Sequence, residues 1–333
     1  FVPGKKDLFK GSIENAQNQL EILIQNSIKQ QMISDVPLGA FLSGGIDSST
    51  IVAILQSMST KPVRTFSIGF ENENFNEAPF AKQIATHLKT EHNELYVNPK
   101  DVLKVIPDIG EIYCEPFSDS SQIPTYILSK FTKKHVTVAL TCDGGDELFG
   151  GYNRYLFANQ LWSKISSTPI WTREIIKNFS QNLSPEFINL MLLPIKFLLP
   201  DNYKINLIGD RVLKGLKIIS VKNNLELYKN LISHSNFTDQ LLAKNENYQS
   251  VIDNNYNDKV FENDFIHKMM IYDFLDYLPN DILVKLDRAA MACSLETRVP
   301  FLDRDIIEFV WKLDLGCKIK GDKGKFLIRN ILQ

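Results

Sequence analysis

The segment Ser43-Gly44-Gly45-Ile46-Asp47-Ser48-Ser49 has the residue types of a phosphate-binding loop. Two glycines leave the backbone unobstructed and allow positive φ angles. A helical pattern resumes at Thr50, so the free N–H groups of a helix N-terminus are expected to face the loop. The chain has no GxxxxGK[ST] motif, so no loop lysine is available for a γ-phosphate. The alternative is a tight turn capped by Asp47 or Ser48 at a helix start.

A second glycine-rich segment, residues 141–152, carries Asp143, Asp146 and Glu147 within five positions. It follows an apolar run, and the carboxyl ends of parallel strands meet at one edge of a sheet. We therefore expect both loops to lie at the same edge. A carboxylate beside phosphate makes sense chiefly through a bridging Mg²⁺, so Asp47 and Asp146 are expected to share magnesium on one pyrophosphate. A solvated acidic turn is the alternative.

Strand-like runs alternate with helical patterns up to residue 152. This alternation predicts an α/β fold: a parallel twisted sheet with helices on both faces. The expected strands are 36–42, 63–70, 92–97 and 136–140, and the expected helices are 12–32, 50–55, 77–88, 102–112 and 123–131. Beyond this point strand signals become sparse. The predicted division is an α/β nucleotide-binding core over about 12–152 and a mainly helical part over about 153–333.

Composition excludes several classes of function. The 333 residues include 37 basic and 39 acidic side chains, and this balance gives no global field for nucleic acid or an anionic membrane. No apolar run approaches the length that a membrane span needs. The cysteines are far apart, without zinc spacing, which predicts reduced thiols in a cytoplasmic protein. They are Cys114, Cys142, Cys293 and Cys317.

Four motifs occur in a fixed order: SGGIDSS at 43–49, FSIGF at 66–70, TCDGGDELFGGYNRY at 141–155 and LDRAAMACSLETRVPFLD at 286–303. Together they resemble the synthetase half of glutamine-dependent asparagine synthetases, within the ATP-pyrophosphatase group. The resemblance implies an adenine nucleotide alpha-hydrolase-like fold and a C–N ligase. It also implies that ATP adenylates the side-chain carboxylate of aspartate, releasing pyrophosphate. Ammonia then converts β-aspartyl-AMP to asparagine and AMP.

The resemblance implies a role for each matching residue. Asp143 and Lys325 are expected to be catalytic, with Lys323 as a substitute for Lys325 in another register. Asp47 and Asp146 are the expected Mg²⁺ ligands. The residues expected to bind ATP or pyrophosphate are Phe41, Leu42, Ser43, Gly44, Gly45, Asp47, Ser48, Ile68, Thr141, Cys142 and Gly144.

The chain departs from the family at three places. Cys142 stands where glycine is usual, Asp143 where glutamate is usual, and residues 115–124 lack the arginine that some members use to hold aspartate. One alternative keeps the adenylation chemistry and changes the acceptor, as in sugar-acid amidation in polysaccharide biosynthesis or a β-lactam synthetase-like reaction. Another is a nucleotide-binding domain without catalysis. Glu296 and Arg298 are expected to form a buried ion-pair network.

The family also has an N-terminal glutaminase domain with a nucleophilic cysteine as its first residue. This chain has no cysteine before Cys114, so it cannot hydrolyse glutamine by that route. We expect the glutaminase domain to lie upstream and to supply ammonia from glutamine. A homodimer is also consistent with the resemblance.

Overall fold

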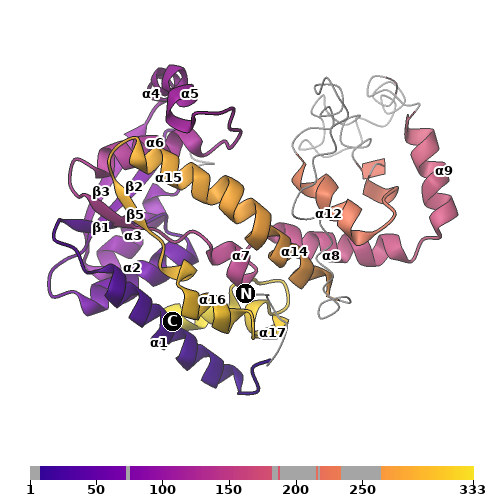
Figure 1. Cartoon of the computed structure of the whole chain (residues 1–333), viewed down its shortest axis with the longest axis horizontal. Helices are drawn as coiled ribbons and strands as arrows, with labels where there is room; N and C mark the ends of the chain where they lie inside the picture. Colours follow the sequence, from indigo (N-terminus) through magenta and orange to yellow (C-terminus); the bar gives the residue numbers. More distant parts are fainter. Residues whose placement is uncertain (1–7, 73–75, 182–186, 188–214, 217, 234–263) are drawn as a thin grey trace. The chain divides into compact units, whose positions relative to one another are not determined.

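The computed structural model describes residues 8–72, 76–181, 187, 215–216, 218–233 and 264–333 (Figure 1). Two compact units are present, the first comprising Phe1–Tyr152 and Gln249–Gln333 and the second Asn153–Tyr248. The expected division had placed everything after residue 152 in one helical part. Instead, residues 264–333 pack with the first unit, because they supply a fifth strand and a helix that packs on α2. Most of 182–263 lies outside the described residues.

The first unit holds all the strands found in the described residues. The strands are β1 (Leu38–Phe41), β2 (Arg64–Phe70), β3 (Glu91–Val97), β4 (Val138–Leu140) and β5 (Glu296–Arg298). The helices before residue 153 are α1 (Ile13–Gln31), α2 (Ile46–Met58), α3 (Ala78–Leu88), α4 (Pro99–Val105), η2 (Ile106–Asp108), α5 (Ile109–Tyr113), α6 (Gln122–Thr132) and α7 (Gly145–Phe149). Those after residue 263 are α14 (Phe265–Tyr272), the π-helical η6 (Asp273–Ile282), α15 (Leu283–Met291), η7 (Pro300–Leu302), α16 (Arg304–Val310), α17 (Leu315–Lys318) and α18 (Phe326–Leu332).

The five strands form one sheet in the order β3-β2-β1-β4-β5, and every neighbouring pair is parallel. This confirms the predicted fold class and the four predicted strands. The fifth strand was not predicted, because three residues with two charged side chains carry no apolar signal. The predicted helix 102–112 is divided into α4, η2 and α5. The division falls at Pro107, which has no N–H to continue the helical ladder.

Helix α1 follows directly from its sequence. The Ser12 hydroxyl accepts a hydrogen bond from the Asn15 N–H at 3.1 Å and so satisfies one free donor of the first turn. Ala16, Leu20, Ile24 and Ile28 recur at four-residue intervals, so they share one face. All four are fully buried, and this face packs toward α2, α16 and α18.

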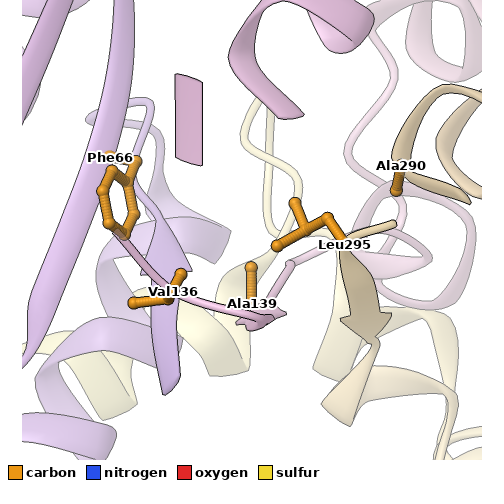
Figure 2. Close-up of a cluster of buried hydrophobic side chains, with 5 residues drawn as sticks. All are labelled: Phe66, Val136, Ala139, Ala290 and Leu295. Atoms are coloured by element: carbon orange, nitrogen blue, oxygen red, sulfur yellow. The ribbon is translucent and has the colours of Figure 1, made fainter. Parts of the chain in front are cut away.

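Helices cover both faces of the sheet. Helix α2 contacts α1, α3 and α18 in one layer, whereas α6 and α15 pack against each other in the layer on the other face (Figure 1). Figure 2 shows the buried cluster under the α6–α15 layer. Its members come from β2, from β4 and the residue two positions before it, from α15, and from the residue just before β5: Phe66, Val136, Ala139, Ala290 and Leu295. The Phe66 ring meets Phe131 of α6 edge-on at 6.1 Å, which fixes α6 against the sheet.

The described part of the second unit is helical, with α8 (Asn153–Ser166), α9 (Ile170–Gln181) and α12 (Asn224–Ile232). Arg173 is buried and joins two segments of this unit, donating from Nε to Thr168 O at 2.8 Å and from Nη1 to Val221 O at 3.2 Å. Across both units, the described helices are too short or too polar to cross a membrane.

Candidate active site

The first loop connects the end of β1 to the start of α2 at the centre of the sheet. Gly44 has φ +82°, and a Cβ there would lie 2.7 Å from Ala81 N, so only glycine fits. The Ser48 hydroxyl accepts from Ser43 N–H at 3.2 Å and lies 3.0 Å from the Ser43 hydroxyl. Gly45 precedes α2, and no side chain caps that helix end. The free N–H groups and dipole of α2 can therefore receive an anion.

Asp47 lies in the first turn of α2 and is only 6% exposed. Its Oδ2 accepts a hydrogen bond from Lys325 Nζ at 2.5 Å. Its Oδ1 is buried and has no partner among the residues that the structure describes. Burial raises the pKa of Asp47 to about 6, the Lys325 charge opposes this rise, and the Asp146 and Asp143 charges add to it. The structure thus brings four predicted site residues into one electrostatic cluster.

Lys325 stands between the two loops. It precedes α18, and its backbone N–H donates to Phe149 O at 2.9 Å, which holds the residue beside α7. Its Nζ lies 2.5 Å from Asp47 Oδ2 and 2.8 Å from Asp146 Oδ1. Burial lowers the pKa of Lys325, but the two carboxylates outweigh burial and raise it, so the ammonium is charged. Lys323, the substitute in another register, is exposed and lies outside this cluster.

Two glycines of the second loop make this close approach possible. A Cβ on Gly145 would lie 2.6 Å from Asp47 Oδ2. A Cβ on Gly151 would overlap both Asp146 Oδ1 and the Lys325 side chain. A side chain at either position would push the carboxylates away from the lysine. The charged cluster can therefore form only with glycine at both positions.

Three residues predicted to lie beside the nucleotide, Thr141, Cys142 and Asp143, differ in their environments. Burial raises the pKa of Asp143, and the positive charge of Lys285 opposes that rise. Burial also raises the pKa of the Cys142 thiol, with Asp143 and Asp47 adding to the effect. Thr141 is buried, and its N–H donates to Arg298 O at 2.8 Å, which extends the pairing of β4 with β5.

The apolar residues predicted to contact adenosine lie near the ends of β1 and β2. Phe41 packs against the buried cluster of Figure 2, so its ring is engaged in the core. Leu42 is buried, and its N–H donates to Phe66 O at 2.9 Å. Ile68 is half-buried in β2. Gly144 has φ +83° and packs against Leu302.

The expected buried ion-pair network at Glu296 and Arg298 takes another form. Glu296 is 55% exposed, and its Oε1 accepts from Arg298 Nε at 2.6 Å. Arg298 Nη1 also donates to Gln31 O at 2.6 Å and Ile33 O at 2.8 Å. The expectation of a buried network was therefore wrong, because both side chains lie on a short strand at the sheet edge. Arg298 instead fastens β5 to the C-terminal end of α1.

Two further groups of polar residues were not predicted to have a role: Lys285 with its partners on the α6–α15 side, and Glu147 in α7. Lys285 Nζ lies 3.1 Å from Asp119 Oδ2 and 3.4 Å from Ser121 Oγ. Glu147 was noted only for its charge, yet it is buried and accepts from the Tyr152 hydroxyl at 2.6 Å. Burial raises the pKa of Glu147 to about 7. No local motif links Asp119 to Lys285, which is 166 residues away in the chain.

The chain resembles known proteins of one family over nearly its whole length. Residues 19–333 match the family described as asparagine synthase. The chain is 33% identical to asparagine synthetase [glutamine-hydrolyzing] 1 of Bacillus subtilis, over 97% of this chain and 49% of that protein. It is 30% identical to a putative asparagine synthetase [glutamine-hydrolyzing] of Mycobacterium bovis, over 95% of this chain and 45% of that protein. The chain thus spans about half the length of the curated relatives it matches.

Proposed function

Because the chain belongs to the asparagine synthase family, we propose that it is the ATP-using half of an asparagine synthetase. It would convert aspartate to asparagine through β-aspartyl-AMP, releasing AMP and pyrophosphate. The observation that carries the proposal is the meeting of Asp47, Asp146 and Lys325 where the loops after β1 and β4 lie side by side. A phosphate-binding helix start, two carboxylates and a buried lysine suit pyrophosphate as a leaving group.

The first step is a nucleophilic substitution at the α-phosphorus of ATP. An oxygen of the acceptor's carboxylate attacks that phosphorus, and the bond to the bridging β-phosphate oxygen breaks, so pyrophosphate leaves. Negative charge grows on pyrophosphate as the bond breaks. The free N–H groups of α2 and the ammonium of Lys325 would stabilise this charge in a partly buried site.

In the second step ammonia attacks the acyl carbon of the adenylate. The C–O bond to AMP breaks, AMP departs, and the nitrogen loses one proton to give the amide. Adenylation matters because a free carboxylate is a poor electrophile and AMP is a good leaving group. Ammonia would come from glutamine hydrolysed on a further domain, as the names of the curated relatives suggest.

The residues present fit a magnesium ion bound with ATP. Mg²⁺ usually takes one or two protein carboxylates and completes its shell with water and substrate phosphates. Asp47 Oδ1 is a buried oxygen without a partner in the described residues, and Asp146 is partly exposed beside it. Within those residues no cluster of three potential ligands occurs, so phosphate oxygens would have to complete the shell. When bound, the ion would neutralise charge on the phosphates.

The proposal is tested by measuring pyrophosphate release from ATP with Mg²⁺, ammonia and a panel of acids. The expected result is aspartate-dependent release with formation of asparagine and AMP in equal amounts. Release with a sugar acid or another acid but not with aspartate would reject aspartate as acceptor. Tight ATP binding without release for any acid would reject catalysis.

A further inference from the structure

A largely buried ion pair joins α15 to the loop before α6, and the proposed binding of ATP does not use it. Lys285 in the first turn of α15 and Asp119 in the loop before α6 are 12% and 10% exposed, and their Nζ and Oδ2 atoms lie 3.1 Å apart. Lys285 Nζ also donates to Ser121 Oγ at 3.4 Å. An ammonium has three N–H donors, so one remains without a partner in the described residues.

Asp119 is held as an anion. Its Oδ1 accepts from the Ser121 N–H at 2.6 Å and from the Ser121 hydroxyl at 2.5 Å. Burial raises the pKa of Asp119, but these hydrogen bonds and the charge of Lys285 outweigh it and lower the pKa. Its Oδ2 has lone pairs beyond the one used by Lys285. The pair therefore presents one free cationic donor and one free anionic acceptor.

The pair is fixed in place by its surroundings. The Tyr113 hydroxyl lies 3.3 Å from Lys285 O and 3.4 Å from Gln122 O, so it joins the first turns of α15 and α6. The Tyr113 ring stacks on Phe117 with centroids 4.7 Å apart. Helices α6 and α15 pack along each other (Figure 1). A pre-formed pair of charges on two packed helices loses little entropy when it binds a ligand.

Lys285 belongs to α15, and Ala290 of the same helix packs in one buried cluster with Ala139 of β4, the strand that leads into the second loop. The charge of Lys285 acts on Asp143, which follows β4 in the second loop, and Asp143 in turn acts on Asp47. Lys285 is thus electrostatically coupled to the loop that carries Asp146.

We propose that Lys285 and Asp119 bind the α-carboxylate and α-ammonium groups of an amino-acid acceptor. This rests on the proposed function, and it favours an α-amino acid over a sugar acid because only the former carries both charges. Lys285 donates its free N–H to the α-carboxylate, and Asp119 accepts from the α-ammonium. Lys285 also supplies the positive charge that residues 115–124 lack.

The test is equilibrium dialysis of three labelled acids with the full chain and a non-hydrolysable α,β-methylene ATP analogue. The acids are aspartate, succinate, which lacks the ammonium, and β-alanine, which lacks the α-carboxylate. Lys285→Met should weaken aspartate and succinate roughly 100-fold and leave β-alanine within twofold, since a lost charged hydrogen bond has about this effect. Asp119→Asn should weaken aspartate and β-alanine but not succinate. The matched control is Lys130→Met, which removes an exposed lysine of α6 and should change none of the affinities.

Two results would overturn the proposal. One is aspartate affinity in Lys285→Met within twofold of wild type, even with a lowered melting temperature, because the pair would then only link α6 to α15. The other is failure of the wild type to bind aspartate. Pyrophosphate release, measured on the same protein preparations with ATP in place of the analogue, separates the two claims. Aspartate binding that depends on Lys285 without any release supports the subsite and rejects the proposed catalysis.

Discussion

At the scale of single residues, the site depends on one lysine placed against two carboxylates. Lys325 Nζ lies 2.5 Å from Asp47 and 2.8 Å from Asp146, and all three side chains are at least partly removed from water. Charges that are only partly solvated interact more strongly than exposed ones. Small steric changes beside this cluster should therefore have large effects.

Gly151→Ala tests this steric requirement. The added methyl group would overlap Asp146 Oδ1 and the Lys325 side chain, and overpacking of this kind costs about 1–3 kcal/mol. We expect a lower melting temperature and a loss of pyrophosphate release. Gly110→Ala is the matched control, because a Cβ at that helical position meets no atom within 4 Å. Equal melting temperatures and equal activities for the two variants would contradict the geometry.

Lys318 gives a prediction about pH. This side chain is fully buried with its Nζ 4.3 Å from the centre of the Trp311 ring, and burial lowers its pKa to about 7. Between pH 7 and about 10, the unfolded chain carries a proton on Lys318 that the folded chain lacks. The free energy of unfolding should therefore rise with pH across this window, by up to about 1.4 kcal/mol per unit from this residue.

Lys318→Met isolates that contribution. The variant should be more stable than wild type at pH 6, where burying a charged lysine is most costly, and the difference should shrink as pH rises toward 10. Denaturant titrations of both proteins at several pH values measure it. A difference that is constant with pH would show that Lys318 does not titrate in this window.

Among the secondary-structure elements, the strands of the sheet show which ones a sequence pattern can predict and which ones it cannot. Strands β1 to β4 were predicted because strand-like runs alternate with helical patterns in this part of the chain. Strand β5 has two charged residues in three positions, so its place depends on pairing with β4. The two loops were predicted because their glycines and acids are adjacent in sequence. The pairing of Asp119 with Lys285 could not be predicted, because it depends on how α6 packs against α15.

Arg298→Ala tests the attachment of β5 to α1. The variant loses two charged hydrogen bonds to the carbonyls of Gln31 and Ile33, and we expect a loss of stability of about 1–3 kcal/mol. Arg304→Ala is the matched control, since its ion pair with Glu308 is exposed and should contribute nothing measurable. Thermal melts of the two variants should differ clearly. Similar small shifts would mean that Arg298 is not a link between these elements.

The first unit of the molecule is built from two segments that lie far apart in the sequence. Asp47 lies near the start of the described residues, and Lys325, which immediately precedes α18, lies near the end, 278 positions later. Strand β5 and the packing of α18 on α2 bring these segments together. The division expected from sequence cut across this unit, because helical patterns do not reveal which layer a helix joins.

We propose that Lys325 stabilises pyrophosphate as it leaves, and the rate of ATP–pyrophosphate exchange in the presence of aspartate measures this role. Lys325→Met should lower the exchange rate about 10²–10³-fold, the usual effect of losing one group that stabilises developing charge. Lys323→Met removes an exposed lysine two positions away and should exchange at the wild-type rate. Wild-type exchange in Lys325→Met, or an equal loss in both variants, would contradict the claim.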